Sequence, residues 1–105
     1  MKEQDVQVAR ILKEKLASVV RILDFRVFGS RARGDADENS DMDIFIEVPE
    51  LDRGLKEKIL DTAWEVGFTH FMVISPLIFT RQELKHSPLR SSSIVKSILR
   101  EGILV

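Results

Sequence analysis

The chain contains the segment Gly29-Ser30-Arg31-Ala32-Arg33-Gly34 and, after five further residues, Ser40-Asp41-Met42-Asp43. The first part is typical of a tight turn at the end of a strand, because glycine lets a phosphate oxygen approach the backbone. Such turns also present backbone N–H groups that hold phosphate. The second part opens a strand with two carboxylates, the hard oxygen ligands that Mg²⁺ prefers. Together the two parts predict a site for a metal–nucleotide complex.

Residues 41–48 alternate between polar and apolar side chains, as expected for a half-buried strand. Asp41 and Asp43 then project from the same face, about 7 Å apart at the backbone, and repel by about 2 kcal/mol at an effective dielectric near 20. A cation between them would offset this repulsion. An isolated Asp-X-Asp is more often a solvent-facing pair, but the Gly29 turn and the Ser30 hydroxyl shortly before it favour a metal–nucleotide site.

Two arginines follow the glycine turn, and each has two possible roles. Arg31 and Arg33 are candidates for contacts with nucleotide phosphates, or they pair with acids of the same chain. The sequence leaves both alternatives open for both residues.

Periodicity along the rest of the chain predicts an α+β sandwich. Apolar residues at three- and four-residue steps indicate helices over 5–22, 53–66 and 91–100. Alternating or apolar runs indicate strands over 25–28, 41–48 and 71–79. Pro76 in the last run indicates either a sheet-edge position or a bulge. We expect Asp5 to cap the first helix, Gly67 to end the second, and Thr80 with Glu83 to begin a short helix. We therefore expect a single domain over 1–105, with about three strands and helices packed on one face.

Composition excludes several classes of function. The chain has 105 residues and no cysteine, which excludes disulfides, thiolate metal sites and cysteine catalysis. No membrane span or signal peptide is evident, so we expect a cytoplasmic protein without a membrane partner. Residues 35–52 hold eight acidic residues and no basic residue, which argues against general nucleic-acid binding through a large basic patch. Nucleic acid remains a candidate only as a substrate at the predicted site.

The pattern Gly29-Ser30-X-Ala32-Arg33-Gly34, then Ser40-Asp41-X-Asp43, resembles the motif of the minimal nucleotidyltransferases. These are single-domain members of the DNA polymerase β-like superfamily. The resemblance implies a small mixed sheet and an Mg²⁺-dependent transfer of a nucleoside monophosphate, AMP if the substrate is ATP, from a nucleoside triphosphate to a hydroxyl of a protein or RNA. It implies that Gly29 and Ser30 bind the triphosphate and that Asp41 and Asp43 are catalytic metal ligands.

The same motif includes Ser40, which we group with Gly29, Ser30, Arg31 and Arg33 as candidate nucleotide-binding residues. Many relatives resemble antitoxins encoded beside a HEPN-type toxin partner, and some of that group add AMP to a tyrosine of the partner. This implies a toxin–antitoxin role as one setting for the activity.

The chain departs from the family in one respect. The resemblance implies a third carboxylate on a later strand, but residues 71–79 contain no acid, and Ser75 carries the only hydroxyl. Three hypotheses therefore remain. They are an active nucleotidyltransferase, a weak or inactive nucleotide-binding module that neutralises a partner by contact, and a small α/β adaptor whose acid pair is fortuitous. The apolar tail at 103–105 and the apolar edge near Pro76 fit a partner surface and burial within the chain equally well. The sequence does not give the oligomeric state and leaves a homo-oligomer open.

Overall fold

A computed structural model describes residues 1–105, except for the side chain of Arg90. Its elements are α1 (Glu3–Ala17), β1 (Asp24–Phe28), α2 (Gly29–Arg33), β2 (Met42–Val48), α3 (Arg53–Thr69), β3 (Ile74–Thr80), α4 (Arg81–His86), a 3₁₀ turn (Pro88–Ser91), α5 (Ser93–Glu101) and β4 (Ile103–Leu104). None of the helices in the described part of the chain has the length and apolar character that a membrane crossing needs.

The strands form one mixed sheet in the order β3-β2-β1-β4. The β1 strand is antiparallel to β2 and β4, and β2 is parallel to β3. This confirms the expected α+β architecture, although with one strand more than predicted. The additional strand is the apolar tail, whose Ile103 and Leu104 pair with Val27 and Arg26 along the free edge of β1. Pro76 lies on the edge strand β3, as predicted.

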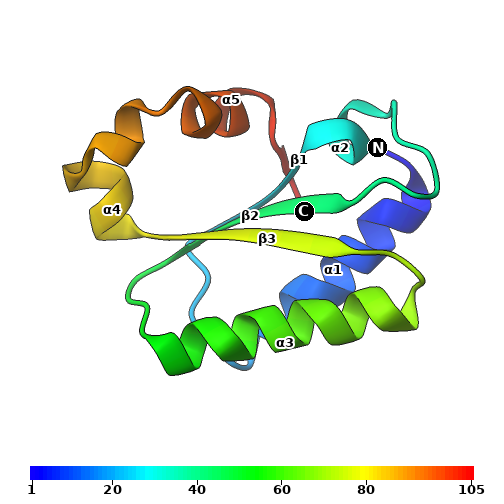
Figure 1. The fold of residues 1–105 in the computed structure, drawn as a ribbon, viewed down its shortest axis with the longest axis horizontal. Coiled ribbons are helices and arrows are strands. Elements are labelled where there is room, and N and C mark those ends of the chain that lie inside the picture. The colour runs from blue at the N-terminus through cyan, green and yellow to red at the C-terminus, as the bar shows by residue number, and fades with distance from the viewer.

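The main core lies between the sheet and the pair α1 and α3, which Figure 1 shows below the sheet. The inward side chains of β2 are fully buried there and are Met42, Ile44, Ile46 and Val48. Strict alternation puts these four on one face, so the carboxylates between them must lie on the other.

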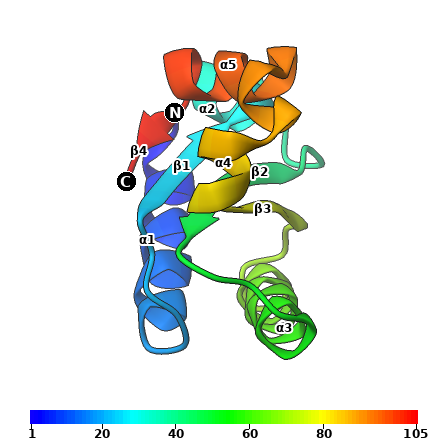
Figure 2. The ribbon, with the colours of Figure 1, turned by 90° about the vertical axis from the view of Figure 1, so that its left-hand side faces the viewer.

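Helices also cover part of that other face, which differs from the expectation that helices pack on one face only. Figure 2 shows α2 and α5 on the side of the sheet away from α1 and α3. Phe45 of β2 is fully buried in a second, smaller cluster with Phe79, Val95 and Ile98. Phe45 shares its face of β2 with the two acids. The C-terminal helices that cover Phe45 therefore leave this face open only at the start of β2, near Asp43.

Two predicted helix boundaries were wrong. Asp5 does not cap α1, which begins at Glu3 and buries Asp5 in its first turn. Gly67 does not end α3 but lies inside it, where the following loop folds back so closely that a Cβ would be 2.5 Å from the carbonyl oxygen of Met72. The predicted capping box of Thr80 and Glu83 is present.

We expect Gly67→Ala to lower the free energy of unfolding by about 1–3 kcal/mol, because the added methyl group overpacks this contact. Urea denaturation measures the change. Gly54→Ala is a matched control in the first turn of the same helix, where the nearest atom is an Asp52 oxygen at 3.6 Å. The control should be neutral or stabilising by up to about 1 kcal/mol, and equal losses in both variants would contradict the close packing.

Candidate functional site

The end of β1 and the start of β2 bring Gly29 and Asp43 into direct contact. Phe28 pairs with Asp43 in the antiparallel register, so the turn that follows Phe28 passes beside the Asp43 side chain. Gly29 has φ +74°, and a Cβ added there would lie 2.4 Å from Oδ2 of Asp43. The close approach and the left-handed backbone both require glycine at this position.

Burial and charge both act on the Asp43 carboxyl group. Burial against the turn raises its pKa most, the neighbouring charge of Asp41 raises it further, and the Arg33 guanidinium lowers it. Thus the ionised form of Asp43 is disfavoured by desolvation and by a like charge, a combination that a bound cation relieves.

Asp41 is exposed just before β2, and its side chain bonds to a residue of β3. The Ser75 hydroxyl donates a 3.4 Å hydrogen bond to Oδ2 of Asp41. Ser75 is also the register partner of Asp43, because β2 and β3 are parallel. Ser75 therefore lies next to both acids, on the strand where the family resemblance implies a third carboxylate.

The other candidate residues divide into those near this contact and those held elsewhere. Ser30 is the second residue of α2, and its hydroxyl bonds to no described group. Arg33 is exposed, makes a 3.3 Å contact with Asp35 and lies near enough to Asp43 to lower its pKa, so its guanidinium can reach a ligand beside Asp43. Ser40 turns its hydroxyl to Asp37 and its carbonyl to Arg31.

Arg31 points into the protein, away from any phosphate at the turn. Its side chain is 7% exposed, and Nη1 donates to Oδ1 of Asp5 at 2.8 Å. Nε and Nη2 both donate to the Ser40 carbonyl. The sequence left two roles open for Arg31, and the structure shows the second, pairing with an acid of the same chain. Its geometry is that of a clamp joining α1, α2 and the loop before β2.

Sequence reasoning missed the contribution of α5 to this region. A hollow of about 240 Å³ lies between the turn and α5, lined by Phe28, Gly29, Ala32, Arg33, Ile94, Ser97, Ile98 and Glu101. The α5 residues are separated from Gly29 by more than sixty positions in the sequence. No local pattern could have indicated them, because only the packing of α5 over the sheet brings them to the turn.

The donor set fits Mg²⁺ in one of its two common modes. No group of three or more carboxylate or histidine side chains within the described residues could form a metal cage. Mg²⁺ in nucleotide enzymes, however, is often held by one or two carboxylates together with the substrate phosphates. Asp41, Asp43 and the glycine cradle at Gly29 suit that arrangement.

The profile of a known family describes nearly all of this chain. Residues 6–105 match the model of the "Nucleotidyltransferase domain" family. The chain belongs to that family. The matched region includes the turn, both acids, β3 and α5.

Two relatives support the assignment to this nucleotidyltransferase family. One, from Methanocaldococcus jannaschii, is named "Putative protein adenylyltransferase MJ0141" and is 38% identical over 84 residues, 77% of this chain and 77% of that protein. The other, from Thermococcus cleftensis, is named "Protein adenylyltransferase MntA" and is 31% identical over 93 residues, 89% of this chain and 84% of that protein.

Solved structures agree on the fold. A structure titled "Structure of putative minimal nucleotidyltransferase" has a TM-score of 0.65 at 21% identity, and the match covers 99% of this chain and 97% of that one. A Sulfolobus solfataricus structure titled as a "putative nucleotidyltransferase" has a TM-score of 0.52 at 21% identity over 97% and 82% of the two chains. The resemblance read from the sequence is thereby confirmed.

We expect Asp5→Ala to lower the free energy of unfolding by about 3–5 kcal/mol, because it leaves the buried Arg31 guanidinium without its counter-charge. Asp35→Ala removes the acid that faces the exposed Arg33 and should cost no more than about 1 kcal/mol. Chemical denaturation of both variants measures the difference. Equal, small losses would show that the Arg31 pair does not hold the fold.

The Asp43 pKa gives a pH-dependent prediction. Because this pKa is raised on folding, the folded state holds the proton more tightly than the unfolded chain, and Asp43 reduces stability as the pH rises from its unfolded pKa through its folded pKa. Without divalent ions, Asp43→Asn should therefore melt at a higher temperature than the parent at neutral pH. The gain should vanish below about pH 4, where both states of the parent are protonated. Melting curves across this range test it, and a gain independent of pH would contradict it.

Proposed function

We propose that this chain is an Mg²⁺-dependent protein adenylyltransferase, which transfers AMP from ATP to a hydroxyl group of an acceptor protein. The observation that carries the proposal is the Asp43 carboxylate held against the bare backbone of Gly29. The names of the two relatives, both protein adenylyltransferases, support AMP and a protein as the substrates. We further propose that residues 1–105 act as one domain in the cytoplasm.

The residues of the chain have distinct parts in this proposal. Asp41 and Asp43 hold Mg²⁺, the Gly29 backbone and the Ser30 hydroxyl hold triphosphate oxygens, and the exposed Arg33 contributes a positive charge. Mg²⁺ would neutralise phosphate charge and stabilise the leaving pyrophosphate. The reaction forms a bond between the acceptor oxygen and the α-phosphorus and breaks the bond from that phosphorus to the oxygen that bridges to the β-phosphorus. Pyrophosphate leaves with the electron pair of the broken bond, and the hydroxyl proton passes to solvent water.

The biological setting in the proposal comes from the resemblance to minimal nucleotidyltransferases. That resemblance favours a HEPN-type toxin as the acceptor, modified on a tyrosine, with this chain as its antitoxin. The observation on Ser75 favours a second candidate, a weak or inactive module that binds nucleotide and neutralises the partner by contact, because a hydroxyl stands where a third carboxylate is expected.

Transfer of labelled AMP tests the proposal. The protein is incubated with Mg²⁺, ATP labelled at the α-phosphate, and the product of the neighbouring gene or total cell protein. We expect a labelled polypeptide. Asp43→Asn should lower the rate of labelling by about a hundredfold or more, because the bound metal lowers the barrier by several kcal/mol. Glu47→Gln is the matched control, since Glu47 lies on the same strand but pairs with Arg81 at the other end.

The outcomes distinguish the candidates. Label in RNA instead of protein would change the acceptor class but not the reaction. No label, with MgATP binding retained, would favour the binding module, and a gain of transfer in Ser75→Asp would then identify the missing carboxylate as the cause. Absence of any thermal stabilisation by MgATP, where saturation at 100 times the Kd should add about 2.7 kcal/mol, would overturn both candidates.

A further inference from the structure

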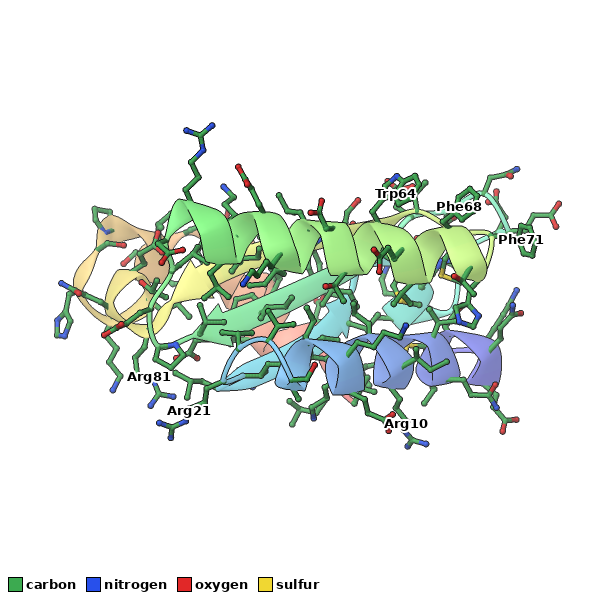
Figure 3. All side chains as sticks on the ribbon, turned by 90° about the horizontal axis from the view of Figure 1, so that it is seen from below. Arg10, Arg21, Trp64, Phe68, Phe71 and Arg81 are labelled. Atoms are coloured by element: carbon green, nitrogen blue, oxygen red, sulfur yellow. The ribbon has the colours of Figure 1, made fainter. Side chains whose placement is uncertain are left out.

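An aromatic surface lies at the end of α3, outside the site described above. It consists of Trp64, Phe68, Phe71 and Val73, all exposed. Figure 3 shows Trp64 and Phe68 on the outer side of α3, near its C-terminal end, with Phe71 just beyond them. The rings of Trp64 and Phe68 stack at 5.2 Å. So much apolar area gathered in one place on a small domain is typical of an interaction site.

Phe71 occupies a position where folding favours glycine. The end of α3 is closed by bonds from Phe71 N–H to the Phe68 carbonyl and from Met72 N–H to the Gly67 carbonyl. This is the Schellman arrangement, whose left-handed residue is usually glycine. Phe71 takes that place with φ +58° while its side chain is 94% exposed. The ring therefore opposes the local backbone preference and contributes little to the core, which points to a role outside the fold.

The aromatic surface adjoins the acid pair. The β2 and β3 strands are parallel, so the segments leading into them lie at the same end of the sheet, together with the end of α3 (Figure 1). The Val73 carbonyl accepts a 2.8 Å hydrogen bond from the N–H of Met42, the residue between Asp41 and Asp43. A protein resting on the aromatic surface would thus extend to the metal-binding acids.

Two hollows on either side of Phe68 give the surface its shape. One, of about 540 Å³, reaches Glu38 and Ser40 in the loop before Asp41. The other, of about 420 Å³, runs between the outer side of α3 and the edge strand β3. Phe68, Met72 and Val73 line both hollows, so the apolar surface is continuous from α3 to the loop before Asp41, residues 34–40.

The charge beside this surface is negative. Asp61 and Glu65 are exposed on the flank of α3 next to Trp64 and Phe68, and neither makes an ion pair with a described basic group. Glu38 lines the larger hollow, and no lysine or arginine among the described side chains lines either one. A second copy of the chain would bring this acidic surface against its equal, whereas a partner with basic residues would complement it.

We propose that the aromatic surface is the docking site for the acceptor protein, and that the docking segment carries apolar side chains flanked by lysine or arginine. The identification of the docked partner as the acceptor of AMP rests on the proposed function. Docking holds the partner beside the acids, so that the acceptor hydroxyl is presented to the nucleotide without any contact from the aromatic residues to the reacting atoms.

Trp64 is the only tryptophan in the chain and reports directly on this surface. The first experiment titrates the protein, without nucleotide or metal, with an amphipathic helical peptide that has a leucine stripe flanked by lysines. A matched peptide has glutamate in place of each lysine. We expect Trp64 emission to shift to shorter wavelength with the lysine peptide only. Equal shifts with both peptides, or a shift with neither, would overturn the proposal.

Phe71→Gly separates docking from folding, because it removes the ring and relieves the left-handed backbone. We expect this variant to keep or raise the melting temperature while it binds the lysine peptide about tenfold more weakly. Leu104→Ser is the control for the loss of an exposed apolar side chain outside the aromatic surface. Leu104 lies in β4 and is 67% exposed, as Trp64 is, and its variant should bind the lysine peptide as the parent does. Equal affinity in Phe71→Gly and the parent would overturn the assignment of Phe71.

Self-association is a separate outcome. In analytical ultracentrifugation, we expect the parent not to form a dimer through this surface. Phe71→Gly should therefore sediment as the parent does. If such a dimer forms, and Trp64 emission shifts with protein concentration alone, the surface joins two copies of the chain and the proposed acceptor docking is wrong.

The labelled-AMP assay connects docking to transfer. With the polypeptide that becomes labelled, Phe71→Gly should raise the acceptor KM about tenfold, while stabilisation by MgATP stays unchanged. Equal acceptor KM values would overturn the docking proposal and leave the proposed function standing. If the lysine peptide shifts the Trp64 emission but no polypeptide is labelled, the proposed function is contradicted. The aromatic surface would then still be a protein-binding site.

Discussion

The close contact between Gly29 and Asp43 is the constraint on which the site depends. It joins the turn after β1 to the first residues of β2, and it exists because no Cβ separates the backbone from the carboxylate. The same contact desolvates Asp43, and the neighbouring Asp41 adds a like charge. The turn thus both shapes the cradle and creates the electrostatic need for a cation.

A buried ion pair keeps this turn in place. Arg31 of α2 is buried and is held by Asp5 of α1 and by the Ser40 carbonyl. One guanidinium therefore fixes the ends of the acid loop, residues 34–40, to the first helix. A planar group with five donors is suited to such a task, because it can bond a carboxylate and a carbonyl at once. This explains why the two arginines of the motif have different roles.

The two faces of β2 divide the molecule between stability and chemistry. Its apolar side chains lie in the main core with α1 and α3, and the opposite face is closed at Phe45 by the C-terminal helices. Only the beginning of that face, at Asp43, stays open. Beside it, the parallel strand β3 brings Ser75 to the same end of the sheet as the segment with Phe71 and Val73, which is part of the aromatic surface. The site and the proposed docking surface are neighbours for this topological reason.

The sequence by itself determined the alternation of β2, the capping box at Thr80 and the glycine turn that precedes the acid strand, because each depends on residues close together in the chain. Only the tertiary structure decided that Asp5 pairs with Arg31, that Gly67 continues its helix, that the tail forms β4 and that α5 lines the turn. Those features depend on contacts between distant residues. Local patterns specify which face of an element is apolar, but not which distant element covers it.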